Sequence, residues 1–167
     1  MIMNKKIIFL LLCTLICFTS WSQELTTFIL VRHAEKANDG TRNPPLNELG
    51  YQRAANLATL LQKQQVSALY STPFTRTEET LQPLADQQKL QIQTYDPQAG
   101  AAWLEELKAR HQGGTVLISG HSNTIPGLAN ALLGEERFAQ FSESEYSNLI
   151  VIVAPEVGNA QLIRLSF

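Results

Sequence analysis

Cysteine is nearly absent from this chain of 167 residues, and its two cysteines, Cys13 and Cys17, lie near the N-terminus. The rest of the chain therefore has no disulfide framework, no thiolate nucleophile and no cysteine ligand for a metal. Basic runs and basic residues interleaved with aromatic ones are also lacking, which argues against nucleic acid as a partner. Because the sequence has no internal repeat, low-complexity tract or long linker, we expect a single domain.

Long hydrophobic runs are missing except at the N-terminus, where "IIFLLLCTLICF" follows the basic "MIMNKK". This layout is typical of a secretory signal peptide, and Ser20 and Ser22 stand at −3 and −1 of a cut before Gln23. The apolar run is short for a membrane span. We therefore expect residues 1–22 to be a signal peptide and the protein to be exported, periplasmic or extracellular, with no stable membrane span after cleavage. The alternative is an uncleaved anchor.

The expected mature chain, residues 23–167, has the size of one ordinary domain. It carries 11 basic and 15 acidic side chains, a formal net charge of −4. Strand-like patterns cover 26–31, 67–71, 90–95, 115–119, 148–154 and 160–167, and helical patterns cover 48–63, 74–88 and 99–112. Residues 120–134 read as a loop that leads into a further helix, which stops at Gly134. Pro83 is expected to kink its helix or to end the first part of it.

This alternation predicts an α/β fold, specifically a three-layer α/β/α sandwich. Strands that alternate with helices form a mostly parallel sheet covered on both faces. The last two strands, close together in sequence, should form an antiparallel edge hairpin.

Arginine and histidine side chains follow several of the expected strands. Arg32 and His33 follow the first strand, His121 follows the strand "TVLIS", and Arg76 lies in the first turn of the helix after the second strand. The carboxyl ends of parallel strands share one edge of a sheet, so these residues can converge. Arginine donors match phosphate oxygens, and the set predicts a cationic phosphate pocket.

Four segments in this order resemble the histidine phosphatase superfamily, which includes the cofactor-dependent phosphoglycerate mutases. They are "LVRHAEK", "LNELGYQRA", "STPFTRTEET" and "LISGHSNT", and the resemblance spans Phe28 to Leu133. The chain departs from the usual pattern at Ala34, where the family commonly has glycine, and so resembles the branch with an RHG or RHA motif. Substitution of one small residue for another should be tolerated.

The resemblance implies a role for each matching residue. His33 would be the nucleophile that forms a phosphohistidine, and Arg32, Arg76 and His121 would bind the phosphoryl oxygens and stabilise the transition state. Asn123 is a further candidate phosphate donor, at a helix start where Thr124 is the expected cap and Pro126 occupies the first turn. Arg42, in the loop over the site, is a further candidate substrate contact. No cofactor and no metal are implied.

The general acid is the part of the family pattern with no clear counterpart. Family members commonly use a glutamate after the third strand, where this chain offers Asp96 and, as a weaker candidate, Glu105. A shortened acid segment is similar to that of small members acting on phosphohistidine in proteins. The expected substrate is therefore a small phosphorylated molecule or a phosphoprotein, and the lack of long insertions argues against mutase activity.

Two other classes of function stay open. One is a non-catalytic domain that binds phosphate or phosphoproteins, although such a domain does not need the nucleophile. The other is a metal-dependent hydrolase with His33, His121, Asp96 and Glu35 as ligands, which the adjacent arginines oppose because positive charge disfavours a bound cation.

Several polar and aromatic residues have structural interpretations. Glu35 is expected to pair with Arg42 or Lys36. His111 is expected near a helix C-terminus, where the helix dipole favours a cation, and Trp103 is expected in the core.

Overall fold

The computed structural model describes residues 24–167, so the expected signal peptide, residues 1–22, and the expected new N-terminus at Gln23 lie outside the described residues. Six strands and four helices follow one another within residues 24–167. They are β1 (Thr26–Arg32), α2 (Glu48–Leu61), β2 (Ala68–Ser71), α3 (Thr75–Gln88), β3 (Ile92–Thr94), α4 (Ala101–Arg110), β4 (Thr115–Gly120), α5 (Thr124–Leu133), β5 (Asn148–Glu156) and β6 (Asn159–Ser166). None of the helices within residues 24–167 is long and apolar enough to cross a membrane.

All six strands form one mixed sheet in the order β3-β2-β4-β1-β5-β6. The pairs β2–β3, β2–β4 and β1–β4 are parallel, whereas β5 and β6 form an antiparallel hairpin against β1. The predicted α/β fold with an antiparallel edge is therefore confirmed. Because β1 lies between the parallel strands and the hairpin, its carboxyl end is a natural place for a ligand crevice.

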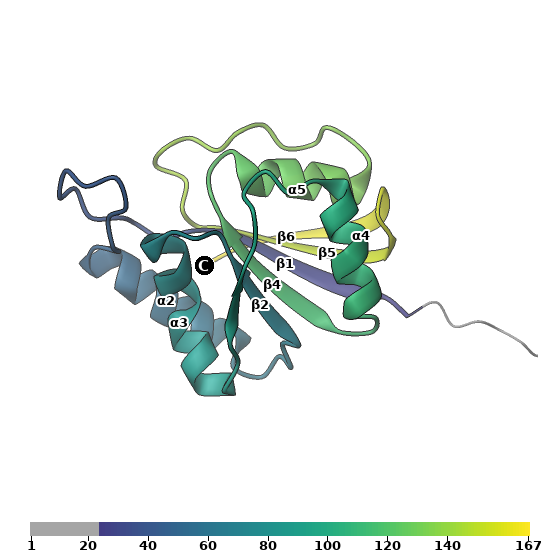
Figure 1. The fold of residues 1–167 in the computed structure, drawn as a ribbon, viewed down its shortest axis with the longest axis horizontal. Helices are drawn as coiled ribbons and strands as arrows, with labels where there is room; N and C mark the ends of the chain where they lie inside the picture. The colour runs from purple at the N-terminus through teal and green to yellow at the C-terminus, as the bar shows by residue number, and fades with distance from the viewer. Residues whose placement is uncertain (1–23) are drawn as a thin grey trace, which may run out of the picture.

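Helices cover both faces of the sheet, with α2 and α3 on one side and α4 and α5 on the other (Figure 1). Successive strand residues point to opposite faces, so β1 contributes to two separate cores. Phe28 and Leu30 pack in the cluster that includes residues of α4 and α5. Ile29 and Val31 pack in the cluster that includes residues of α2 and α3. Apolar residues on both faces of one central strand explain why "FILV" is a continuous apolar run.

Helix α3 continues through Pro83 to Gln88, so this proline does not end the helix. Proline inside a helix costs about 3 kcal/mol or more through its lost hydrogen bond and its clash with the preceding turn. Leu81 and Leu84 lie on either side of Pro83 and are 0% and 1% exposed, so burial of this helix face offsets that cost.

Two predicted side-chain roles are corrected by the structure. Glu35 pairs with Arg53, not with Arg42 or Lys36, and the shortest of their contacts is 2.6 Å. Helix α5 begins after Asn123, and the Thr124 hydroxyl accepts the backbone N–H of His121 instead of capping the helix.

Candidate active site

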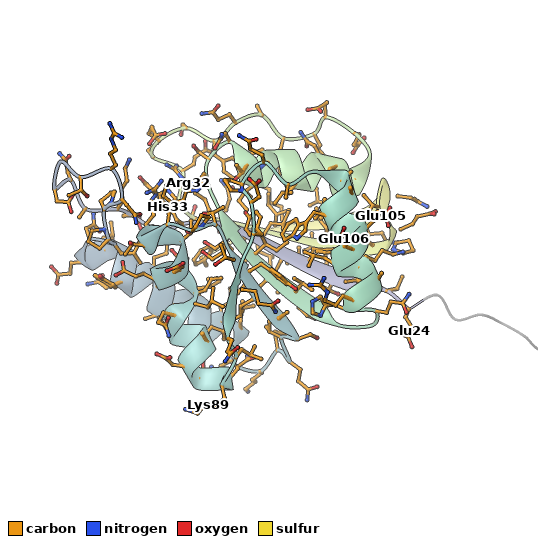
Figure 2. The ribbon with its side chains drawn as sticks, in the orientation of Figure 1. Glu24, Arg32, His33, Lys89, Glu105 and Glu106 are labelled. Atoms are coloured by element: carbon orange, nitrogen blue, oxygen red, sulfur yellow. The ribbon has the colours of Figure 1, made fainter. Side chains whose placement is uncertain are left out.

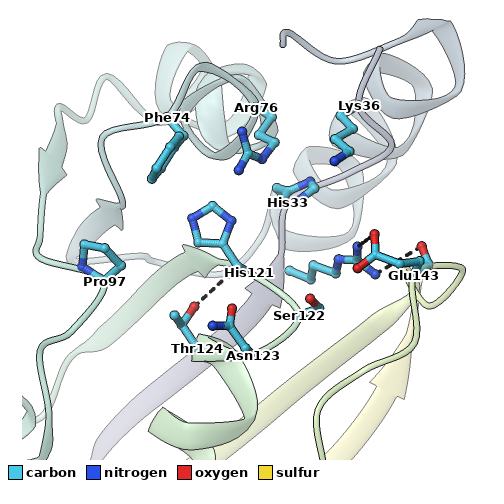
Figure 3. Close-up of a pocket in the computed structure, with 11 residues that line it drawn as sticks. His33, Lys36, Phe74, Arg76, Pro97, His121, Ser122, Asn123, Thr124 and Glu143 are labelled. Carbon is cyan, nitrogen blue, oxygen red and sulfur yellow. Dashed lines mark hydrogen bonds and ion pairs between the residues drawn. The ribbon is translucent and has the colours of Figure 1, made fainter. Parts of the chain in front are cut away.

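Sheet register brings the polar strand ends together. Arg32 at the end of β1 is level with Gly120 at the end of β4, and the backbone N–H of His33 donates to the Gly120 carbonyl over 2.9 Å. A pocket of about 350 Å³ opens at this edge. Its lining residues are Arg32, His33, Lys36, Phe74, Arg76, Pro97, His121, Ser122, Asn123, Thr124 and Glu143. Figure 3 shows the side chains of His33, Arg76 and His121 turned toward the same space.

His33 is held as a neutral imidazole with one nitrogen free. Its Nδ1 lies 2.7 Å from the Ala34 carbonyl oxygen, which can only accept, so Nδ1 carries the proton and Nε2 carries the lone pair. The side chain is 4% exposed. Burial, followed by the charges of Arg76 and Arg32, lowers the pKa of His33 to about 3. A neutral imidazole with a free Nε2 is the form that can attack phosphorus.

His121 faces His33, with the two ring centroids 5.5 Å apart. Its Nε2 lies 3.0 Å from the hydroxyl of buried Thr72, which fixes the ring orientation. Burial and the charge of Arg76 lower the pKa of His121 to about 4. The residue before His121 is Gly120, where the Thr124 hydroxyl leaves no room for a side chain. A Cβ at this position would lie 2.8 Å from the hydroxyl oxygen.

Arg32 is 1% exposed and is held by the segment between α5 and β5. Its Nη1 donates to the carbonyls of Ser142, Glu143 and Glu145 at 2.7, 3.3 and 3.1 Å. Its Nη2 lies 3.2 Å from a Glu143 carboxylate oxygen, and its Nε is buried with no hydrogen-bond partner among residues 24–167. A buried unpaired donor at a pocket is costly unless a ligand satisfies it.

Arg76 and the start of α5 supply further donors. The Arg76 guanidinium lies 4.7 Å from the ring centroid of Phe74, and its Nε is also a buried donor without a partner among the described residues. Ser122, Asn123 and Thr124 line the opposite side at the N-terminus of α5 (Figure 3), where helix amides and the helix dipole favour an anion.

The structure gathers most of the residues that sequence analysis predicts. Arg32, His33, Arg76, His121 and Asn123 all line the pocket.

Asp96, Arg42 and Glu105 are not among the residues that line the pocket. Asp96 is exposed, and its carboxylate accepts the Gln98 backbone N–H over 2.8 Å. Arg42 is exposed in the loop before α2. Glu105 lies on α4, away from Arg32 and His33 in Figure 2. The roles of Asp96 and Arg42 stay predictions.

Several pocket residues were missed by sequence analysis, namely Lys36, Phe74, Pro97, Ser122 and Glu143. Lys36 and Ser122 lie within three residues of His33 and His121, so their proximity to those histidines was an available signal. Phe74 had a similar signal in "STPFTR", two residues before Arg76. Glu143 had none, because "SESEYSN" reads as an ordinary polar loop.

Residues 24–167 contain no group of three or more histidine, cysteine, aspartate or glutamate side chains positioned to hold a metal ion. His111, the remaining histidine, lies at the C-terminal end of α4, and its Nε2 is 3.0 Å from the Tyr70 hydroxyl. Burial, together with the charge of Arg110, lowers the pKa of His111, so the expected stabilisation of a cation at this helix end does not dominate.

Comparison with known proteins gives one family and several structures. Residues 28–97 match the histidine phosphatase superfamily, branch 1. No curated protein sequence matches the chain.

Several similar solved structures are described as phosphatases. The protein histidine phosphatase SixA, solved with tungstate, is 21% identical with a TM-score of 0.70, and the match covers 84% of this chain and 96% of SixA. A putative phosphohistidine phosphatase SixA from Agrobacterium tumefaciens is 25% identical with a TM-score of 0.64, covering 85% and 98% of the two chains. A mycobacterial glucosyl-3-phosphoglycerate phosphatase is 16% identical with a TM-score of 0.68, covering 83% and 97%.

The family match includes the first three of the four segments on which the resemblance depends. The family match ends at residue 97, whereas the segment with His121 lies beyond it. The sheet register nevertheless places His121 beside His33 at the same edge of the sheet.

Proposed function

From its confirmed resemblance to the histidine phosphatase superfamily, we propose that this protein is a histidine-type phosphatase that forms a phosphohistidine intermediate on His33. The proposed substrates are phosphate monoesters or phosphohistidine. The observation that carries the proposal is the hydrogen bond from His33 Nδ1–H to the Ala34 carbonyl. It leaves the Nε2 lone pair free in a pocket that also contains Arg32, Arg76 and His121.

The proposed reaction has two steps. In the first, His33 Nε2 attacks phosphorus, the bond from phosphorus to the leaving oxygen breaks, and a phosphohistidine forms. In the second, water attacks the same phosphorus and the bond from phosphorus to Nε2 breaks, which releases phosphate and restores the neutral imidazole. The depressed pKa of His33, about 3, keeps the nitrogen unprotonated and able to attack in the free enzyme.

Charge stabilisation in both steps comes from the surrounding cations and donors. Arg32 and Arg76 each present a buried Nε–H that has no partner among residues 24–167, and Lys36 adds a third positive charge. Phosphoryl transfer leaves little covalent chemistry to the protein, so preorganised donors supply most of the rate enhancement. A bound phosphoryl dianion also favours the protonated form of His121, which then donates to an equatorial oxygen.

The substrate is proposed to be a small phosphorylated molecule or a phosphoprotein. Structures with this fold include proteins described as phosphatases of phosphohistidine, of glucosyl-3-phosphoglycerate and of phosphoserine. Their range shows that the fold accepts several leaving groups. A phosphate-release screen on the purified protein over these classes identifies the one that is used.

Export is a separate part of the proposal and rests on the sequence alone. The basic start, the apolar run and the small residues before Gln23 support cleavage after Ser22. The intact mass of the exported protein should correspond to a chain that begins at Gln23. Full-length protein retained in the membrane fraction would contradict this expectation.

Trapping the intermediate tests the catalytic proposal. Phosphohistidine is acid-labile, so the reaction with a labelled aryl phosphate is quenched in alkali, with EDTA present throughout. The wild type should retain label on the protein and release phosphate, whereas His33→Ala should do neither. His111→Ala is the matched control, because it removes a histidine that lies outside the pocket, and it should still be labelled.

Two outcomes favour the alternative functions. A protein that binds phosphate without forming the intermediate or releasing phosphate is a binding domain. Activity that EDTA abolishes and zinc or manganese restores indicates a metal-dependent hydrolase.

A further inference from the structure

Glu143 is the one carboxylate among the residues that line the pocket in the described chain, 24–167. It lies in the segment between α5 and β5, and Figure 3 draws it among the side chains that line the pocket. Its carboxylate oxygen is 3.2 Å from Arg32 Nη2, and its side chain is 77% exposed. The structure therefore places an exposed acidic side chain at the pocket that sequence analysis did not predict there.

The donors of Arg32 are divided between the protein and the pocket. Nη1 is occupied by backbone carbonyls, of which Ser142 is the nearest at 2.7 Å. In the described part of the chain, Nε has no partner and Nη2 contacts Glu143, so these two groups remain for a ligand. These two groups form one edge of the guanidinium, which matches two phosphoryl oxygens. A phosphoryl group bound there uses Nη2, beside or in place of the Glu143 carboxylate, and therefore lies next to the Glu143 carboxyl.

The backbone keeps Glu143 in place during that exchange. Its carbonyl accepts from Arg32 Nη1 over 3.3 Å, and the Glu145 carboxylate binds the Ser142 N–H over 2.7 Å. Only the side chain has to move.

We propose that Glu143 is the proton donor to the leaving oxygen, a role that rests on the proposed function. As His33 Nε2 bonds to phosphorus, the bond to the leaving oxygen breaks and its electron pair stays on that oxygen. The carboxyl proton of Glu143 moves to the same oxygen, so the alcohol leaves neutral. Water then attacks phospho-His33, the bond from phosphorus to Nε2 breaks and phosphate leaves with the protons of the water, while the Glu143 carboxylate regains a proton from solvent. Glu143 thus takes the role that sequence analysis predicted for Asp96.

Glu143→Gln tests this role with little risk to folding, because the side chain is exposed and glutamine keeps its size. An alkyl phosphate has a poor leaving group that needs the proton, whereas the leaving oxygen of an aryl phosphate is already stable as an anion. We expect kcat for an alkyl phosphate to fall by about 10²–10⁴ and kcat for an aryl phosphate to change only slightly. The dependence of the rate on leaving-group pKa should steepen accordingly.

Glu135→Gln is the matched control, since Glu135 is an exposed carboxylate of the same segment that does not line the pocket. It should leave both substrates unaffected. Asp96→Asn should show no selective loss on the alkyl phosphate. Trapped phospho-His33 from the aryl phosphate should persist in Glu143→Gln.

Three results overturn the role of Glu143. They are equal losses on both substrate types, no loss on either, and selective loss of the alkyl phosphate in Asp96→Asn instead. A wild type that neither releases phosphate nor carries label on His33 contradicts the proposed function itself, and with it any proton donor. The two failures are therefore distinguishable.

Discussion

The pocket has two rims that differ in how their side chains are held. The strand rim consists of Arg32, His33 and His121, which follow directly from β1 and β4 and are fixed by register and burial. The loop rim consists of Lys36, Pro97 and Glu143, which come from segments without regular structure. Groups on rigid elements suit the reacting phosphorus, whereas groups on loops suit the varied remainder of a substrate.

The largest expected effect is a difference in kcat/KM between two arginine variants. One arginine lies in the pocket beside the strand rim, and the other lies in an outlying loop. Arg76→Ala removes a buried pocket donor and should lower kcat/KM for an aryl phosphate by about 10²–10³, as expected for loss of one preorganised donor. Arg42→Ala should change it far less, because Arg42 is exposed and outside the lining set. Equal losses in steady-state kinetics would show that the loop closes over the substrate.

Burial of His33 in the strand rim predicts that the free energy of unfolding decreases as the pH is lowered. Its folded pKa of about 3 lies below the ordinary value of 6.5, so between these values the unfolded chain binds a proton that the folded chain does not. Each pH unit below 6.5 then costs about 1.4 kcal/mol, or about 2 kcal/mol between pH 6.5 and 5.

Denaturant unfolding at pH 7, 6 and 5 measures this effect. The pKa values of His121 and His111 are also lowered, so these residues contribute to the same pH dependence. The contribution of His33 is the difference between the wild type and His33→Gln in the slope of the free energy of unfolding against pH. A variant with an unchanged slope would contradict the depressed pKa.

The smallest expected effect concerns Thr72, which contacts His121 of the strand rim but does not line the pocket. Thr72→Val keeps the shape of the buried side chain and removes the hydroxyl 3.0 Å from His121 Nε2. We expect kcat to fall about tenfold, the size of one lost hydrogen bond of about 1.4 kcal/mol. Inhibition by inorganic phosphate should change less, since Arg32 and Arg76 remain. Unaltered kcat would show that the ring needs no partner.

The sequence predicted the strand rim because its signals are local. Apolar runs mark β1 and β4, and a charged residue at the end of each run can only face the shared edge of a parallel sheet. The predictions that failed also have physical reasons. Arg53 pairs with Glu35 because α2 packs beside the segment that follows β1, and such a tertiary contact leaves no mark on spacing.

The loop rim could not be predicted for the same reason. Glu143 reaches the pocket because backbone carbonyls of its segment bind Arg32, more than a hundred residues earlier in the chain. That contact depends on where the turns of an irregular segment fall, not on the residue types in it. Pro83 shows a related limit of prediction from sequence. Proline locally disfavours a helix, but burial of the helix face around Pro83 outweighs this preference.

The bond between His33 and the carbonyl of its own neighbour has an evolutionary consequence. Many catalytic histidines need a separate acidic side chain to fix their tautomer, and a single mutation can remove that partner. Here the partner is the peptide group of residue 34, which every amino acid supplies. Substitutions can therefore accumulate in the loops and alter the substrate while the nucleophile stays correctly protonated. A site built in this way can change its specificity freely and still keep its chemistry.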